Sequence, residues 1–286
     1  MSGRPDPATF LSGEAGQITG PRLTLRATAA DLMLWARAAL ALTGPRLDRL
    51  AARAERRKVL VLSIYRPESR LPGAVGALRS ERHDVRLALG TTSPGADRTL
   101  ARDTVLTGLD GGKFENLNRL VELADDDRDW VLVCDDDVQL PPRFLDRFIA
   151  LCDALHLDLA QPAQSSLSHA AWDVTRRRPG IARITRFVEI GPVTAFSHRA
   201  AAELFPFPEL RFGWGLDSHW AAVARERGWT LGVVDALPVR HEWQPIAESY
   251  SRREATDEAV EFLTGKPYVT NVEAQRTLQT IGRIPS

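Results

Sequence analysis

The chain has 286 residues, of which 44% are hydrophobic and 26% charged, and its 37 basic residues balance 37 acidic ones. A neutral chain lacks the positive field on which binding to nucleic acid depends, so we expect no nucleic-acid partner. This length allows one large α/β domain with extensions. The two cysteines, Cys134 and Cys152, lie in apolar segments, which excludes a disulfide scaffold and favours a cytoplasmic location.

Residues 1–57 precede the first strong strand pattern and are expected to form a helical N-terminal extension. Thr28 is the candidate N-cap of a helix that runs to about Leu42, where Gly44 and Pro45 would end it. A second helix, rich in arginine, follows as far as about residue 57.

No segment indicates a signal peptide or reaches membrane-spanning length. The longest apolar candidate, residues 32–42, is short and carries Arg37. We interpret it as an amphipathic helix packed on the domain. The alternative is peripheral contact with the inner face of a membrane.

From Lys58 onwards, strand-like and helix-like segments alternate, which predicts an α/β sheet with helices on both faces. Continuous apolar runs such as 59–64 and 130–134 are typical of strands covered on both sides. We expect strands at 59–64, 85–89, 103–106, 130–134, 157–161, 187–196 and 230–234, and helices at 114–124, 142–152, 217–227 and 254–263.

Three adjacent aspartates, Asp135, Asp136 and Asp137, directly follow the apolar run 130–134. Their carboxylates repel one another and are costly to desolvate, and a divalent cation would relieve that repulsion. Oxygen ligands of this kind suit Mg²⁺ or Mn²⁺. The alternative is a solvated acidic turn, which is how we interpret the earlier acidic run 125–127.

The segment VLVCDDDVQLPPRFLDRF resembles the DXD segment of GT-A fold glycosyltransferases, in which a strand leads to Asp-x-Asp and then to a helix that begins with proline. The resemblance implies a mixed, mainly parallel Rossmann-like sheet and a metal-dependent reaction with a nucleotide sugar. By it, Asp135 and Asp137 are the two motif carboxylates. Asp137 would be a metal ligand, and Asp135 would be shared between metal and ribose. Asp136 would be the variable middle residue beside the nucleotide.

Two further segments resemble the donor-binding parts of the same family. VLVLSIYRPES resembles the first strand and nucleotide-binding loop, which makes Ser63, Tyr65 and Arg66 candidates for contact with the nucleoside. The loop and helix start around Lys113 and Asn116 resemble the part that faces the diphosphate, and a helix N-terminus favours anions. An exposed lysine at a helix start is the alternative for Lys113.

The turn Gly-Trp-Gly-Leu-Asp at 213–217 resembles the acceptor-side signature of the family. The form Gly-Trp-Gly-x-Asp also occurs in an uncharacterised group of plant and bacterial transferase-like proteins. By the resemblance, Asp217 is the catalytic base that takes the proton of the acceptor hydroxyl, and Trp214 stacks on a sugar. The alternatives are a helix N-cap and a structural tryptophan. Many relatives have two acids where this chain has one.

Two residues complete the candidate site. His241 follows a predicted strand, at a place where many GT-A enzymes have a histidine that binds the metal, and a neutral imidazole suits Mn²⁺. Glu189, before Gly191 and Pro192, is a candidate to line the sugar site. A solvated histidine and a strand-edge carboxylate are the respective alternatives.

We therefore expect an N-terminal extension over 1–57, a GT-A domain over 58–245 and a C-terminal tail with a helix over 246–286. The resemblance implies an inverting transfer of sugar to an acceptor hydroxyl, with UDP-sugars favoured as donors and GDP-sugars next. The alternatives are a non-catalytic nucleotide-sugar or carbohydrate-binding relative and a sugar-phosphate nucleotidyltransferase.

Overall fold

The computed structural model describes residues 4–12, 20–124, 127–168, 170–241 and 251–285. The boundary expected at 245–246 and two of the three aspartates in the run 125–127 lie outside these residues. The strands are β1 Lys58–Tyr65, β2 Asp84–Thr91, β3 Thr104–Leu106, β4 Trp130–Cys134, β5 Val138–Gln139, β6 Leu159–Gln164, β7 Ala182–Thr185, β8 Val193–Ser197, β9 Leu231–His241 and β10 Thr277–Ile281. The helices are α1 Pro7–Phe10, α2 Pro21–Leu40, α3 Thr43–Arg53, α4 Leu71–Leu78, α5 Lys113–Ala124, α6 Phe144–Ala154, the 3₁₀ turn η1 Asp173–Thr175, α7 His198–Leu204, α8 Leu216–Arg227, α9 Arg252–Leu263 and α10 Asn271–Ala274.

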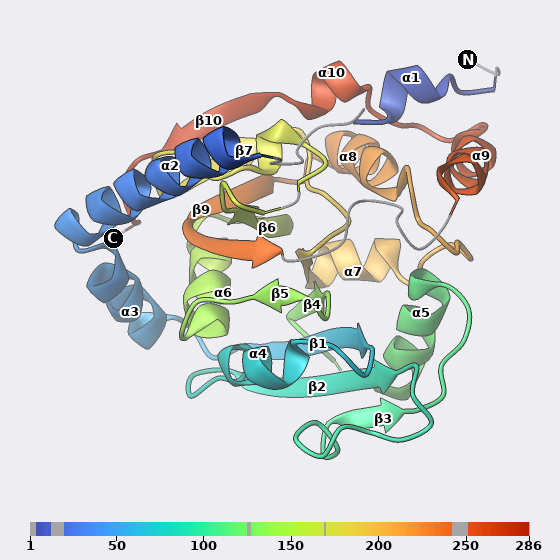
Figure 1. Cartoon of the computed structure of the whole chain (residues 1–286), viewed down its shortest axis with the longest axis horizontal. Coiled ribbons are helices and arrows are strands. Elements are labelled where there is room, and N and C mark those ends of the chain that lie inside the picture. Colours follow the sequence, from blue (N-terminus) through green and yellow to red (C-terminus); the bar gives the residue numbers. More distant parts are fainter. Residues whose placement is uncertain (1–3, 13–19, 125–126, 169, 242–250, 286) are drawn as a thin grey trace.

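One twisted sheet runs through the molecule in the order β10-β7-β9-β6-β8-β4-β1-β2-β3, and the short β5 pairs with β9 (Figure 1). The pairs β1–β2, β1–β4, β2–β3 and β6–β9 are parallel, whereas β8 is antiparallel to both β4 and β6. The predicted mixed, mainly parallel sheet flanked by helices is confirmed.

The alternation of side chains along β1 explains why its sequence is apolar throughout. Val59 and Val61 belong to one buried cluster, which the helices α3, α4 and α6 cover. Leu60 and Leu62 belong to a second cluster on the opposite face, under α5, α7, α8 and α9. A strand between two helical layers needs apolar residues at every position.

The expected strand at 187–196 is wrong in its extent. The strand β8 begins only at Val193, because the preceding segment does not join the ladder. That segment contains the cis peptide Gly191–Pro192. The polar tail also contributes more than its expected helix, since β10 pairs antiparallel with β7 at the edge of the sheet. Both features depend on pairing between residues far apart in the chain.

The N-terminal helices also differ from the expectation. The helix α2 begins at Pro21, and the Thr28 hydroxyl donates to the carbonyl of Thr24 instead of capping a helix start. Gly44 and Pro45 lie in the first turn of α3, where a proline needs no intrahelical partner for its missing N–H. None of the described helices combines the length and apolarity needed to cross a bilayer.

Candidate active site

The first of the three aspartates lies beside the cis peptide before β8. Asp135 forms an ion pair with Lys113, with 2.5 Å between Oδ1 and Nζ, and its amide donates to the carbonyl of Pro192. A Cβ atom on Gly191 would come within 2.8 Å of Asp135 Oδ2 and 3.7 Å of Lys113 Nζ. The start of α5, the end of β4 and the segment before β8 therefore meet at this carboxylate.

The second aspartate joins the ends of two parallel strands. Asp136 is buried, and both of its carboxylate oxygens accept hydrogen bonds from Arg66, from Nη2 at 2.9 Å and from the backbone amide at 2.9 Å. Its carbonyl also accepts from the amide of Arg70. Asp136 is thus an anchor for the loop after β1, a role that its place as the variable middle residue did not predict.

The third aspartate contacts the candidate histidine. Asp137 Oδ1 lies 3.0 Å from His241 Nε2, because β5 pairs with the end of β9 and brings Val138 opposite His241. Burial would raise the pKa of Asp137, but the hydrogen bond and charge of His241 outweigh it and lower that pKa. Burial likewise would lower the pKa of His241, but Asp137 raises it.

The expected metal ligands are Asp135, Asp137 and His241. Among the residues that the structure describes, no three carboxylate, imidazole or thiol groups come together in a way that would hold a metal ion. The carboxylate of Asp137 and the imidazole of His241 are adjacent and are donor types that suit Mn²⁺. Asp135 does not join them in this arrangement, because its carboxylate is directed to Lys113.

A hollow lies at the carboxyl ends of β1 and β2, where open sheets commonly bind ligands. Of the three nucleoside candidates, Tyr65 and Arg66 line it, whereas Ser63 is fully buried in β1. The phenol of Tyr65 is held by the Thr104 hydroxyl at 2.9 Å and by the amide of Asp97 at 3.1 Å. The lining residues are Tyr65, Arg66, Pro67, Ser69, Pro72, Ser93, Gly95, Ala96 and Asp97.

The two diphosphate candidates on α5 have different surroundings. Lys113 is directed to Asp135 at the carboxyl end of β4. Asn116 is buried, its amide donates to the carbonyl of Asp110, and its oxygen accepts from Arg119. The structure therefore brings Lys113, but not the side chain of Asn116, to the acidic turn.

Glu189 and Asp217 form a second acidic group, with no cation in ion-pair contact among the described residues. Asp217 is 6% exposed, and its Oδ1 accepts from the amide of Ser218 at 2.9 Å. Burial raises its pKa to about 7 against the lowering effect of hydrogen bonds from the backbone of Ser218 and Ile190 and the side chain of Trp172. The sequence predicts that Asp217 begins a helix, but it does not reveal that the side chain is buried.

Glu189 is held from three sides. Its carboxylate accepts from Gln164 Nε2 at 2.8 Å, from the Thr175 hydroxyl at 3.1 Å and from the amide of Ala171 at 3.2 Å. Burial first, and then the negative charge of Asp217, raise the pKa of Glu189 to about 8. The negative charge of Asp217 therefore disfavours ionisation of Glu189.

Two buried glutamines complete this acidic group and were missed by the sequence analysis. Gln161 Oε1 accepts the amide of Glu189, whereas Gln161 Nε2 and Gln164 Oε1 have no hydrogen-bond partner among the described residues. A buried polar atom without a partner is costly, and such atoms often point to a ligand or water that completes the set. Two glutamines within the buried strand β6 were the signal in the sequence.

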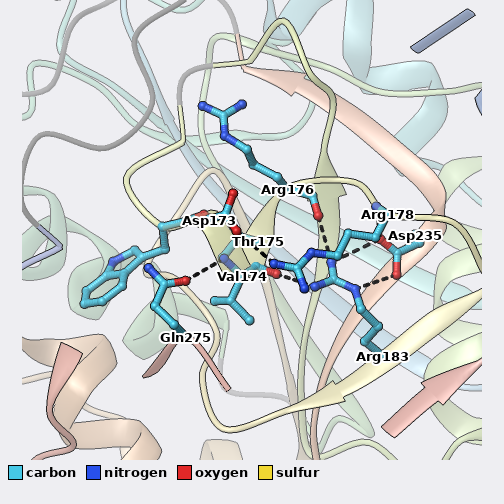
Figure 2. Close-up of polar contacts among 9 residues, drawn as sticks. Asp173, Val174, Thr175, Arg176, Arg178, Arg183, Asp235 and Gln275 are labelled. Carbon is cyan, nitrogen blue, oxygen red and sulfur yellow. Dashed lines mark hydrogen bonds and ion pairs between the residues drawn. The ribbon is translucent and has the colours of Figure 1, made fainter. Parts of the chain in front are cut away.

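A buried ion pair holds the segment that contacts Glu189 (Figure 2). Arg183 donates to Asp235 from Nε at 2.8 Å and from Nη2 at 3.1 Å, and both side chains are almost fully buried. The same guanidinium donates to the carbonyls of Val174 and Arg176, on either side of Thr175. The pair thereby fixes the backbone that presents the Thr175 hydroxyl to Glu189.

The turn that carries Trp214 is held by the C-terminal helix α9. Glu258 accepts hydrogen bonds from three successive amides, those of Arg211 at 2.7 Å and of Phe212 and Gly213 at 3.0 Å. A Cβ atom on Gly213 would lie 1.9 Å from the Phe114 ring, so only glycine fits there. Trp214 is partly buried and packs against the core under α8. No motif in the sequence singled out Glu258.

No family model matches the sequence. No curated protein matches it either. Among solved structures, the chain is similar to a mycobacterial protein at 18% identity, covering 78% of each chain with a TM-score of 0.49.

It is also similar to residues 1–349 of TarS from S. aureus in complex with UDP-GlcNAc, at 14% identity, 72% coverage of this chain, 66% of that one and a TM-score of 0.49. The chain is similar as well to GalNAc-T7 with UDP, GalNAc and Mn²⁺, at 11% identity, with 68% coverage of this chain, 45% coverage of that one and a TM-score of 0.46. The chain thus spans less than half of the GalNAc-T7 structure.

Proposed function

We propose that the chain is a GT-A type glycosyltransferase that moves a sugar from a nucleotide-sugar donor to an acceptor hydroxyl. One observation carries the proposal. The segment 189–192 joins two acidic groups of opposite character, with the aspartates after β4 at one end and the buried pair Glu189 and Asp217 at the other. Sugar transfer needs both a charged place for a diphosphate and a base for a hydroxyl proton.

The donor would lie along the carboxyl ends of β1 and β4. Its nucleoside occupies the hollow beside Tyr65 and Arg66, and its diphosphate faces Lys113, whose ammonium group offsets the charge that develops on the leaving phosphate. The resemblance to GT-A enzymes favours a UDP-sugar, followed by a GDP-sugar.

Asp217 acts as the base in this proposal. The acceptor oxygen forms a bond to the anomeric carbon as the bond from that carbon to the diphosphate oxygen breaks, and the bonding electrons leave with the nucleotide. The proton of the acceptor hydroxyl passes to the Asp217 carboxylate. A pKa of about 7 suits a base that works near neutral pH. Attack from the face opposite the leaving group inverts the anomeric configuration.

Asp137 and His241 are the residues that would hold a divalent ion, Mn²⁺ or Mg²⁺. When bound, such an ion supplies positive charge to the diphosphate. Glu189 contacts Gln164 and Thr175 on the Asp217 side of the site, and the negative charge of Asp217 helps to raise the pKa of Glu189.

The test combines thermal shift with donor turnover, using UDP-, GDP- and dTDP-sugars with and without Mn²⁺. We expect one nucleotide class to raise the melting temperature, more so with Mn²⁺, because a ligand that binds only the folded state stabilises it. Asp217→Asn should keep that shift and lose turnover. The absence of a shift with any nucleotide sugar contradicts the donor site, and full turnover by Asp217→Asn contradicts the base.

A further inference from the structure

The helix α2 exposes an unusual amount of apolar surface. The described residues include 11 exposed large hydrophobic side chains, and seven of them lie between residues 23 and 42. Figure 1 shows α2 on the outside of the molecule beside α3. The seven are Leu23, Leu25, Leu32, Met33, Trp35, Leu40 and Leu42.

The two sides of α2 show that its apolar face is directed outward. The side toward the protein consists of residues 27, 31, 34 and 38, which are buried or half-buried and recur at helical spacing. Asp31 fixes this side, because its carboxylate accepts the amide of Ser166 at 3.0 and 3.1 Å. The opposite side consists of residues 25, 29, 32, 36 and 40, all of them alanine or leucine and all exposed.

The hairpin of α2 and α3 is also the basic part of a neutral chain. Residues 21–54 contain six arginines and two aspartates, a net charge of 6 − 2 = +4, and no lysine or glutamate. Both aspartates are engaged, Asp31 with Ser166 and Asp48 with Arg143 and Arg147. The six are Arg22, Arg26, Arg37, Arg46, Arg49 and Arg53.

We propose that the outward face of α2 binds the surface of an anionic lipid membrane. A helix of 20 residues lies flat over about 30 Å. Leu25, Leu32 and Trp35 would enter the boundary between headgroups and acyl chains. Arg22, Arg26 and Arg37 are exposed in the same helix and can extend to lipid phosphates while their aliphatic parts stay on the apolar surface.

The charge of the hairpin favours a membrane over a second copy of the chain. In a two-fold symmetric dimer the same patch lies on both partners, so the hairpin with its net charge of +4 would face its own copy. An anionic bilayer instead provides both negatively charged headgroups for the arginines and an apolar interior for the leucines. Asp31 attaches α2 to the loop after β6, whose Ser168 accepts the amide of His241, so the membrane-facing helix lies close in the fold to the candidate site.

The test is sedimentation of the full chain with vesicles of phosphatidylglycerol mixed with phosphatidylcholine and with vesicles of phosphatidylcholine alone. The chain should sediment with the anionic vesicles, more weakly with the neutral ones and less as salt is added. Leu32→Ser combined with Trp35→Ser should weaken binding about tenfold or more, since each exchange removes an apolar anchor. Replacing Arg22, Arg26 and Arg37 by Gln should cost about fivefold for each arginine on anionic vesicles only.

The matched control is Leu123→Ser combined with Val272→Ser, because both side chains are exposed and apolar but lie outside the hairpin. It should bind vesicles like the unchanged chain, and all variants should keep their melting temperature. Failure of the unchanged chain to sediment with anionic vesicles overturns the proposal, as does equal binding by the Leu32 and Trp35 variant. A dimer in light scattering that this variant abolishes, without vesicle binding, assigns the face to a second copy instead. No donor or acceptor is needed, so the result is independent of the proposed activity.

Discussion

The two acidic groups of this protein consist of the same kind of side chain in opposite electrostatic settings. After β4, each aspartate has its own basic partner: Lys113 for Asp135, Arg66 for Asp136 and His241 for Asp137. Among the described residues, Glu189 and Asp217 accept hydrogen bonds from neutral donors only, and burial raises the pKa of both. The aspartates after β4 are suited to bind charged ligands, whereas Glu189 and Asp217 are suited to bind and release a proton.

A third acidic residue shows that burial alone does not make a carboxylate a base. Asp235 is as deeply buried as Asp217, but Arg183 contacts it with two nitrogen atoms. Burial still raises the pKa of Asp235, and the hydrogen bonds and charge of Arg183 oppose that rise. Asp235 has a structural role because its carboxylate is paired with a cation. The contrast with Asp217 depends on the absence of such a partner among the described residues.

The largest effect is expected for Asp217→Asn, which keeps the shape of the side chain and removes the base. Turnover with the identified donor should fall about a thousandfold while donor binding stays unchanged. Steady-state kinetics and thermal shift measure the two separately. Asp257→Asn, an exposed carboxylate of α9, is the control and should leave both unchanged. Equal losses in donor affinity and turnover contradict the role as base.

The next effect is on stability. Arg183→Met leaves Asp235 buried without its cation and should lower the free energy of unfolding by about 3–5 kcal/mol. Arg183→Met combined with Asp235→Leu removes both charges and should recover most of that loss. Urea unfolding compares the two variants. If the double variant is no more stable than the single one, the cost is in packing and not in the unpaired charge.

A smaller effect should distinguish two neighbouring aspartates. Asp137→Asn should weaken Mn²⁺-dependent activity by about a hundredfold, because it removes a proposed metal ligand. Asp136→Asn is the matched variant in the same turn. It should lower stability by about 1–3 kcal/mol through its lost bonds to Arg66, without a change in the Mn²⁺ concentration needed for half-maximal activity. The same Mn²⁺ dependence in both variants contradicts the assignment of Asp137.

A further effect is the dependence of stability on pH. The pKa values of Asp217 and Glu189 are raised from 3.8 and 4.5 to about 7 and about 8, so the folded state keeps protons that the unfolded state has lost. The contribution of the pair is therefore full at low pH and declines as pH rises from about 4 to about 8. Activity should rise through the upper part of this range, as Asp217 ionises.

Asp217→Asn should flatten this decline and melt a few degrees higher than the unchanged chain at about pH 8. Melting curves across the pH range measure it. A variant whose melting temperature follows the unchanged chain at every pH shows that Asp217 is ionised in the folded protein.

Local patterns predicted the central strands and the two motif turns well. The strand β4 was expected with the bounds that it has, because five consecutive apolar residues between an acidic run and an acidic triplet allow little else. The helix α8 ends before Gly228, as expected, since a glycine there adopts a left-handed conformation without a steric cost. These predictions needed only neighbours along the chain.

The candidate site was harder to predict because its chemistry depends on contacts between distant segments. Gln161 and Gln164 contact Glu189 across about 25 residues, and Glu258 holds the turn at residues 211–213 from a helix in the C-terminal tail. Lys113 was expected to face a diphosphate, and its contact with Asp135 became evident only in the structure. A single sequence does not identify such contact partners, because any carboxylate or amide side chain could occupy the same position.

The sequence by itself determined the alternation of strands and helices, the position of the acidic triplet at the carboxyl end of a buried strand and the turn that leads to Asp217. These follow from periodicity and from residue types at fixed spacing. Only the tertiary structure decided which carboxylates have cations beside them, which are buried with neutral donors, and that α2 directs its leucines outward. Charge and burial at a residue are set by all the segments around it, and folding brings those together from the whole length of the chain.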